Sequence, residues 1–411
     1  MLLKVGVLGS GNFGGQVANV AVSCGYPAVA INASEQDLEL LNPDVIPYLI
    51  GDGKGTGKSG DIAKEFLLSH LGFLKEKDFT NFIDNNDVII MAGSSGGGFG
   101  SNTIPTLTQI LMELYPEKLF IVLTVLPDEN ETYTAQYNSQ QFMLAVTELN
   151  IPYIIYDNDK FKTLSPSESS EKIISNIRID LQVLAGEYIR TTNIGGIDSR
   201  DLLTCLSVPG RMMIDIITPF DELDLVDGSI VKTIRAHIDT NGHAVMVDNK
   251  LIMASAIMYN INNDVNEYAS VVKSELQETF GTHVTDYRNE AVDQDGDTFI
   301  CVVLSGLDLP ATRIDRIISR INKIDSELSG AKKAPTKLGK VESKHRLTAK
   351  KFSGTVSETP VESKSNVDDI IKKFSSGRIP EPPKIPKANK NTMYGKLMNS
   401  DKVDLEESSE E

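Results

Sequence analysis

The chain contains few residues of the kinds that mark metal sites, disulfide-rich domains or membrane proteins. Its 411 residues include no tryptophan, three cysteines and five scattered histidines. No apolar run approaches the roughly 20 residues that a membrane-spanning helix needs. No cysteine or histidine spacing fits a metal site, so we predict no protein-built metal centre. These absences argue against a transmembrane protein and against a zinc protein.

The cysteines and the start of the chain both indicate a reducing compartment. Cys24, Cys205 and Cys301 are far apart, odd in number and set among apolar residues, which favours buried free thiols over disulfides. Residues 1–9 are mostly apolar, but they lack the basic region of a signal peptide, and glycine-rich sequence follows at once. We therefore expect a first core strand rather than a signal peptide, in a cytoplasmic protein.

The net charge of −17 is unevenly distributed. Residues 331–411 carry a net charge of +5, and the preceding residues carry −22. Within the tail, residues 331–400 are basic and the last eleven are acidic. An acidic body argues against direct DNA binding by that body. The tail is therefore the expected contact for an anionic partner.

The segment Gly93–Ser101 is the most informative stretch, with five glycines and three serines. It lies between residues 86–92, which read as a buried strand, and residues 103–114, which have helical period. A small-residue loop at a helix N-terminus exposes backbone N–H groups to an anion. A tight turn is the alternative, but one glycine would satisfy it. We therefore predict a phosphate-binding loop with contacts from Ser95, Gly96, Gly97, Gly98, Phe99 and Gly100.

A second glycine motif follows the first predicted strand, residues 3–8. Gly9, Gly11 and Gly14 have the spacing of a dinucleotide-binding turn between a strand and a helix. Asn32 ends the next predicted strand, where such a protein would place an acidic residue for the ribose. The motif alone suggests an oxidoreductase, but that interpretation gives the loop at 93–101 no role.

A third glycine-rich segment, residues 51–60, resembles a P-loop without its spacing. A P-loop ending at Lys58 would need glycine where Asp52 stands. Residues 41–47 contain two prolines, so we predict no strand leading into this segment. We expect a mobile loop that opens a helix from Asp61, with phosphate contacts from Lys54, Gly55 and Thr56. A flexible surface linker remains the alternative.

The rest of the N-terminal half alternates strands and helices, which predicts an open, mainly parallel α/β sheet. A long helix is expected from residue 167 to about residue 190. Asp198 and Asp201 then stand three apart at a helix start, and spacing alone favours an N-terminal cap. A second domain is expected from about residue 202, with strands at 244–247 and 299–304 and helices at 265–280 and 311–328.

The segment from about residue 329 is rich in lysine, proline and serine and is predicted to be disordered. Within it, residues 367–374 could form a short amphipathic helix on binding a partner. Residues 379–386 read as polyproline II.

The order of these parts resembles the tubulin/FtsZ family of GTP-dependent filament proteins over roughly residues 3–325. Residues 96–101 are similar to the family's glycine signature, with Phe99 in place of its threonine. Residues 158–160 are similar to its Asn-Asp-Lys sequence, and 197–201 to its acidic loop, with Gly196 where asparagine is usual. The resemblance completes the predicted nucleotide contacts: Gly9, Ser10, Gly11, Asn12, Asn32, Lys54, Gly55, Thr56, Ser95, Gly96, Gly97, Gly98, Phe99, Gly100, Pro127, Glu131, Asn158 and Asn176.

This resemblance implies a GTPase that uses GTP/GDP and Mg²⁺ and polymerises with itself. Asp198 and Asp201 would then complete the active site of the neighbouring subunit. The implied organisation is a Rossmann-like GTP-binding domain at 1–170, a central helix and catalytic loop at 171–201, a smaller α+β interface domain at 202–328, and a tail at 329–411.

The departures at Phe99 and Gly196 and the long tail make the chain look more like the plasmid and phage members, TubZ and PhuZ. They imply segregation or positioning of DNA, with the tail binding an adaptor or a DNA-bound complex. An FtsZ-like division protein, a non-hydrolysing nucleotide-binding scaffold and a dinucleotide-dependent oxidoreductase remain alternatives.

Overall fold

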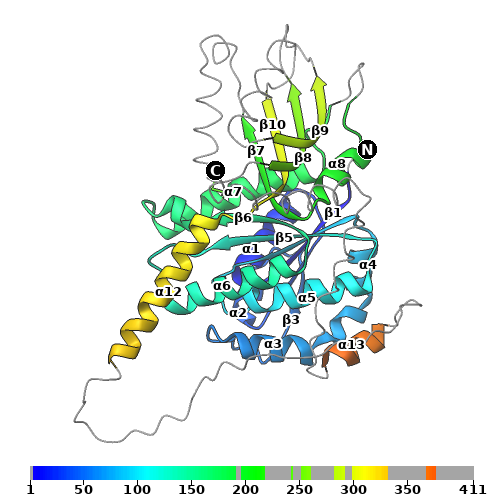
Figure 1. Ribbon diagram of the computed structural model, residues 1–411. Coiled ribbons are helices and arrows are strands. Elements are labelled where there is room, and N and C mark those ends of the chain that lie inside the picture. The colour runs from blue at the N-terminus through cyan, green and yellow to red at the C-terminus, as the bar shows by residue number, and fades with distance from the viewer. Residues whose placement is uncertain are drawn as a thin grey trace, which may run out of the picture.

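Ten strands form one continuous sheet in the computed structural model, which describes residues 3–190, 196–217, 242–243, 251–260, 282–291, 299–331 and 367–375 (Figure 1). The strand order is β3-β2-β1-β4-β5-β6-β7-β10-β8-β9. The strands are β1 Val5–Ser10, β2 Ala28–Asn32, β3 Ile46–Leu49, β4 Val88–Gly93, β5 Leu119–Leu126, β6 Pro152–Asp157, β7 Gly210–Ile217, β8 Leu251–Asn260, β9 Thr282–Ala291 and β10 Phe299–Leu307.

The half of the sheet from β3 to β7 is parallel throughout, and the other half is mixed. Strand β10 pairs antiparallel with both β7 and β8, and β8 pairs parallel with β9. Every residue of β1 and β4 is buried. Parallel strands are buried on both faces because crossover helices cover them, which explains their continuous apolar sequence. The predicted α/β sheet is confirmed.

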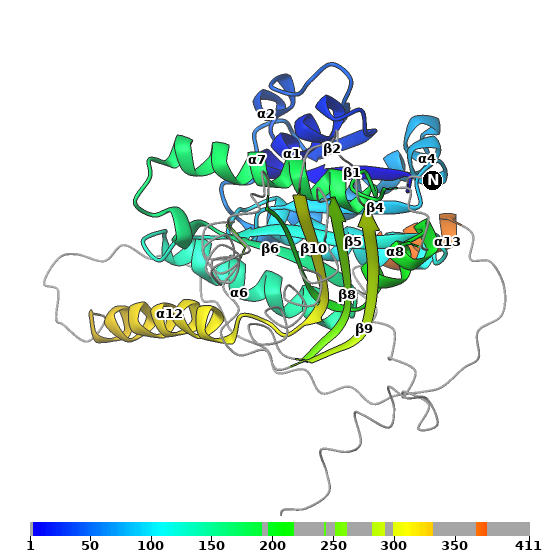
Figure 2. The same cartoon turned by 90° about the horizontal axis from the view of Figure 1, so that it is seen from above.

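Helices cover both faces of the sheet (Figures 1 and 2). One hydrophobic cluster packs α1, α7 and α8 against one face, and a second packs α3, α4, α5, α6 and α12 against the other. The helices are α1 Gly11–Ser23, α2 Glu35–Glu39, α3 Gly60–Ser69, α4 Lys77–Asp84, α5 Gly100–Leu114, α6 Tyr133–Glu148, α7 Pro166–Leu184, α8 Ser199–Leu206, α12 Ala311–Ala331 and α13 Val367–Ser375, with short 3-10 turns η1 Leu71–Lys75 and η2 Asn158–Phe161.

The prediction that no strand precedes residues 51–60 is wrong. Strand β3 runs through Pro47, which pairs with Ala30 of β2. Strand β3 is at the edge of the sheet, with one neighbour. Proline is tolerated at an edge because the N–H that it lacks is not needed by a second strand.

Helix α7 ends at Leu184, earlier than the predicted end near residue 190. Gly186 has φ of +82°, the left-handed conformation that stops a helix. Its N–H donates to Val183 O and the Glu187 N–H donates to Gln182 O, at 2.9 Å each. These two bonds are the pair expected of a glycine-terminated helix. At the other end of α7, Ser165 and Glu168 form a capping box.

The predictions for the second domain and the tail are only partly covered by the described residues. The strand at 299–304 and the helix at 311–328 are confirmed as β10 and α12. The strand at 244–247, the helix at 265–280, the polyproline segment and most of the tail lie outside the described residues. The three cysteines are free, with Cys205 and Cys301 buried and Cys24 half-buried.

Candidate functional site

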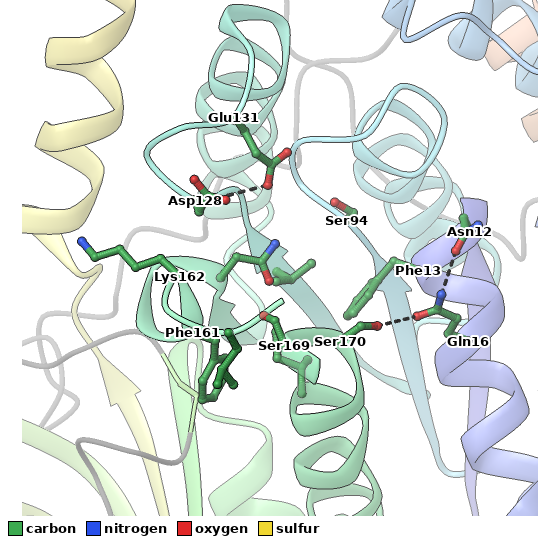
Figure 3. Close-up of a pocket in the computed structure, with 14 residues that line it drawn as sticks. Asn12, Phe13, Gln16, Ser94, Asp128, Glu131, Phe161, Lys162, Ser169 and Ser170 are labelled. Carbon is green, nitrogen blue, oxygen red and sulfur yellow. Dashed lines mark hydrogen bonds between the residues drawn. The ribbon is translucent and has the colours of Figure 1, made fainter. Parts of the chain in front are cut away.

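A cavity of about 540 Å³ opens at the carboxyl ends of the parallel strands (Figure 3). This size lies within the range of small-molecule sites. Its walls come from the start of α1, from the loops after β4, β5 and β6, and from the first turns of α7. The lining residues are Asn12, Phe13, Gln16, Ser94, Val125, Asp128, Glu131, Asn158, Phe161, Lys162, Leu164, Ser169, Ser170 and Ile173. Open parallel sheets bind ligands at this edge.

The turn from β1 into α1 brings the backbone close to its neighbours. Gly11 has φ of +71°, and a Cβ on Gly9 would lie 2.1 Å from Gly14 O. The Ser10 hydroxyl bonds Thr103 Oγ1 at 2.6 Å inside the core, so only its backbone remains for a ligand. Asn12 lines the cavity, and its Oδ1 accepts from Gln16 Nε2 at 2.9 Å (Figure 3).

The central glycine loop is held by buried side chains. Ser95 Oγ donates to Val125 O at 2.7 Å, and Asn138 Nδ2 donates to Gly97 O at 2.8 Å. Phe99 is buried in the core beside the start of α5. Neither Ser95 nor Phe99 therefore turns its side chain to the cavity, and any contact they make with a ligand is through backbone. The loop is fixed in place before a ligand arrives.

Gly97 and Gly98 differ in the space around them. A Cβ on Gly97 would meet nothing nearer than Ser94 at 3.8 Å. A Cβ on Gly98 would lie 2.4 Å from Lys58 Cα and 2.9 Å from Thr56 Oγ1. The central loop and the loop at 51–60 therefore touch through backbone at Gly98, whereas Gly97 has free space above it.

The loop at 51–60 is tied to the end of β2. Gly55 N donates to Ala33 O at 2.7 Å, and Lys54 forms a bridge with Ser34. Thr56 is buried, and the Lys54 side chain is exposed. The Asn32 side chain is occupied within its own segment, since its Nδ2 donates to Asp37 at 3.1 Å. This loop forms a platform beside the central loop, and it does not line the cavity.

The loops after β5 and β6 supply the acidic wall. Glu131 lines the cavity and its Oε1 accepts from Asp128 N at 3.2 Å. Asn158 also lines the cavity, where it begins η2. Pro127 lies behind this wall, packed near the Cβ position of Gly96 at 3.3 Å. Lys162 adds a positive charge to the cavity that sequence reasoning missed.

Arg313 of α12 fastens these two loops together. Its Nε donates to both Asp157 carboxylate oxygens, at 3.1 and 2.9 Å, and its Nη2 donates to Pro127 O. Both side chains of this ion pair are only 3% exposed. Burial raises the pKa of Asp157, and the Arg313 charge opposes that rise. Arg316 extends the contact, reaching Glu129 at 2.9 Å and Asp159 at 3.1 Å. The loops of the cavity wall are therefore anchored to a helix more than 150 residues away in sequence.

Asn176, one of the nucleotide contacts that the resemblance predicts, is not among the cavity-lining residues. It lies one turn along α7 from Ile173, which does line the cavity. Its Nδ2 is 3.4 Å from the Cβ position of Gly242, which itself approaches the cavity-wall residue Phe161. The side chain therefore lies just beyond the wall formed by Phe161.

Asp198 and Asp201 lie at the other end of the strands. Asp198 caps α8, accepting from the N–H groups of Arg200 and Asp201 at 2.8 and 2.9 Å, while Asp201 accepts from Asp198 N at 3.2 Å. Helix α8 lines a second cavity, of about 680 Å³, together with residues at the amino-terminal ends of β1, β4 and β5. These residues are Leu3, Asp87 and Leu119. The two acids are thus remote from the first cavity in a single chain, and they form a capping box with each other.

In the part of the chain that the structure describes, no group of three or more histidine, cysteine or acidic side chains is arranged to hold a metal ion. The same residues include no helix that is long and apolar enough to cross a bilayer.

Comparison with known proteins gives a consistent result. A family model described as "Tubulin/FtsZ family, GTPase domain" matches residues 5–166. The tubulin-like protein CetZ of Pyrococcus abyssi is 28% identical over 217 residues, which are 51% of this chain and 55% of that protein, so the alignment spans about half of the relative.

Solved structures share the fold. The crystal structure of TubZ from Clostridium botulinum phage c-st superposes with a TM-score of 0.64 at 16% identity, covering 80% of this chain and 100% of that chain. CetZ2 from Haloferax volcanii, solved as a GTPγS-bound protofilament, superposes with a TM-score of 0.63 at 21% identity, again covering 80% and 100%.

Proposed function

We propose that this chain, whose residues 5–166 match the GTPase domain of the Tubulin/FtsZ family, binds GTP in the first cavity and hydrolyses it to GDP and phosphate within a head-to-tail filament. One observation carries the proposal. The cavity and the acidic start of α8 lie at opposite ends of the same parallel strands. Stacking identical subunits along the strand direction would bring the acids of one subunit to the cavity of the next.

The residues in and beside the cavity offer contacts that would suit GTP. Its phosphates would lie beside the lining residues Asn12 and Ser94, on the backbone N–H groups of the turn at 9–12 and the loop at 96–98, at the N-termini of α1 and α5. Glu131 would accept hydrogen bonds from the ribose, and Asn158 and Asn176 would serve the nucleoside. The Lys162 charge would partly offset the acidic wall.

The described residues offer an Mg²⁺ ion no dedicated cage. This agrees with an ion held chiefly by phosphate oxygens and water, which is the usual arrangement for Mg²⁺ in nucleotide sites. Bound there, Mg²⁺ would neutralise phosphate charge in the transition state.

Hydrolysis would need the second subunit. A carboxylate from Asp198 or Asp201 would orient a water molecule in line with the γ-phosphorus and accept its proton. The water oxygen then bonds to phosphorus as the bond to the β–γ bridging oxygen breaks. Each isolated chain would bind GTP but would lack this base.

The test is phosphate release and right-angle light scattering, measured together over a range of protein concentrations with GTP, GDP or ATP. Activity per chain should rise steeply above a threshold concentration at which scattering also appears with GTP. Constant activity per chain at all concentrations would contradict the completion of the site by a neighbour.

CetZ2 was solved as a protofilament, which supports the proposal that this chain also assembles with copies of itself. We further propose that the filament segregates or positions plasmid or phage DNA, with the tail from residue 329 binding an adaptor. The basic charge of residues 331–400 supports a tail that contacts an anionic partner. A variant truncated after residue 331 should still polymerise with GTP. It should no longer bind the adaptor or the DNA-bound complex.

The oxidoreductase interpretation predicts a preference for NAD over GTP. It has no use for the loop at 93–101 or for Asp198 and Asp201. Direct comparison of the two affinities decides between them.

A further inference from the structure

The segment Val367–Ser375 of the tail is a helix packed on the body of the protein. This helix, α13, contacts α3, η1 and α5 on the face opposite α1 and α7 (Figure 1). Ile370 and Phe374 are one helical turn apart, so they lie on the same side of α13. They are 4% and 0% exposed, and both belong to the hydrophobic cluster beneath that face of the sheet. The apolar side of α13 is therefore buried against its own chain.

Two ion pairs set the direction of α13. Asp368 near its N-terminus pairs with Lys75 of η1, and Lys373 near its C-terminus pairs with Glu113 of α5 at 2.8 Å. A helix docked in the reverse direction would bring Asp368 toward Glu113 and Lys373 toward Lys75. Charge complementarity of this kind gives specificity more than affinity. The surface formed by α3, η1 and α5 thus distinguishes the two directions of the helix.

The helix depends on this surface for its order. A nine-residue helix is too short to be stable alone in water. Of its side chains that the structure describes, Ile370 and Phe374 are the buried apolar ones. Its two ends contact charges of other elements. Folding of residues 367–375 is therefore coupled to docking, and the undocked segment would expose Ile370 and Phe374.

The chain between α12 and α13 is long enough for this docking. Residues 332–366 separate them. Fully extended, this stretch spans on the order of 120 Å. Helices α12 and α13 lie at opposite sides of the molecule in both views (Figures 1 and 2). A tether of this kind keeps the segment at a high effective concentration near its own body.

We propose that the surface formed by α3, η1 and α5 is a docking site for residues 367–375 of the same chain, and that the apolar side of α13 is available to partners only when α13 leaves this surface. A protein that binds the apolar side of α13 competes with the body for Ile370 and Phe374. Helices α3 and α5 begin at the two glycine loops that touch at Gly98, so the docked segment contacts the helices that follow both loops. Docking of α13 does not require the proposed GTPase activity.

The first test is amide hydrogen exchange in the full chain. Amides of α13 should exchange at least tenfold more slowly than those of a synthetic peptide of residues 363–378. Phe374→Asp should bring them to the peptide rate, and Asp369→Asn, at an exposed position, should not. Wild-type α13 amides exchanging at the peptide rate would overturn the proposal. So would protection that appears only as protein concentration rises, because it would mean a second copy supplies the helix.

The second test uses charge reversal. Lys75→Glu and Asp368→Lys should each lower the protection of α13, and the double variant should restore most of it. If the α13 amides of the double variant exchange as fast as those of the single variants, the pair of Lys75 and Asp368 does not contribute to docking.

The third test uses the same peptide, fluorescently labelled, in trans. It should bind the full chain carrying Phe374→Asp at least tenfold more tightly than it binds wild type, since the wild-type surface is occupied. A peptide carrying Phe374→Asp should not bind either. Equal affinity for the two proteins would overturn docking within one chain.

Discussion

The two ends of the parallel strands carry different chemistry. The carboxyl ends hold a cavity walled by three loops and the start of α7, with backbone N–H groups from two glycine turns close by. The amino ends hold the acidic cap of α8 beside a second cavity. In the part of the chain that the structure describes, the predicted phosphate contacts and the two acids of α8 therefore lie at opposite ends of the strands. If both take part in one reaction, as we propose, the site of one chain is completed by a neighbour.

Removing the charge of Asp201 should have the largest effect. Asp201→Asn keeps an oxygen for the Asp198 N–H but removes the negative charge, so the cap should survive while the base is lost. Turnover should fall by about 10²–10⁴-fold, the usual contribution of a general base. GTP binding, sedimentation and melting temperature should stay near wild type.

If the acids only cap α8, the result differs. Asp198→Ala would then cost about 0.5–2 kcal/mol of stability with unchanged turnover per folded chain. If pelleted Asp201→Asn filaments release phosphate at the wild-type rate, Asp201 acts only in the cap of α8. Mixing this variant with wild type should also lower the activity of the wild type if the acids act across the contact.

Changing Gly97 tests the other end of the strands. Gly97→Val has room in the structure, so the protein should fold. The valine would occupy the space above the loop and should lower GTP affinity by about 100-fold or more, because phosphate could no longer approach the N–H groups. Gly72→Ala, where an added Cβ meets nothing within 4 Å, is the control. Micromolar GTP affinity in a folded Gly97→Val protein would contradict the predicted phosphate site.

Arg313→Leu should loosen the cavity wall. It leaves the buried Asp157 carboxylate without its partner, which typically costs about 3–5 kcal/mol. The combined variant Arg313→Leu/Asp157→Asn should recover much of that loss. Urea unfolding measures both, and GTP affinity in the recovered double variant shows how far the pair positions the loops. An unchanged midpoint in the single variant would show that the pair does not stabilise the fold.

Asn176→Leu should lower GTP affinity by on the order of tenfold to a hundredfold if the amide reads the base, because a base edge would be left unpaired. Equilibrium binding of GTP and ATP to wild type and variant measures this. Equal affinity of the wild type for the two nucleotides would exclude a guanine reader at this position.

The smallest effect concerns the pH dependence of α13 docking. The hydrogen bond and charge of Lys75 lower the pKa of Asp368 below its ordinary value of 3.8, and Lys372 on α13 acts in the same direction. A lowered pKa gives a stabilisation that is complete above the ordinary value and is lost as the pH falls through the lowered one. Protection of α13 relative to free peptide should therefore weaken below about pH 4. The pair of Lys373 and Glu113 is the other charged contact of the helix with the body. A Lys75→Met variant should lose the part due to Asp368.

The sequence predicts those helices, strands and turns that are determined by neighbouring residues in the chain. Strands β1 and β4, α12 and the glycine turns follow from apolar runs and glycine spacing, and the Tubulin/FtsZ resemblance is confirmed by the match over residues 5–166. The end of α7 is also a local feature, because Gly186 stops the helix. The predicted end near residue 190 was too late because that glycine was overlooked.

What the sequence could not give depends on distant partners. Strand β3 was missed because the edge position that tolerates Pro47 is a property of the whole sheet. The Arg313–Asp157 pair joins residues 156 positions apart, and no local pattern links them. The helix at 367–374 was predicted, but its docking surface lies almost 300 residues earlier, at Lys75. The roles of the individual site residues remain predictions.

The anchoring of α12 has a mechanical consequence. Arg313 in its first turn bonds to Asp157 and Pro127 of the cavity wall. The 21 residues of the helix extend about 30 Å from there. Helix α12 also packs against α6 and the core through Ile317 and Ile321, so it can tilt only as a whole and together with that packing. A tilt of about 10° about its first turn would displace its other end, at Ala331, by about 5 Å for a helix of this length. A rearrangement of the loops at Pro127 and Asp157 that tilts α12 would therefore move Ala331 farther than it moves the loops.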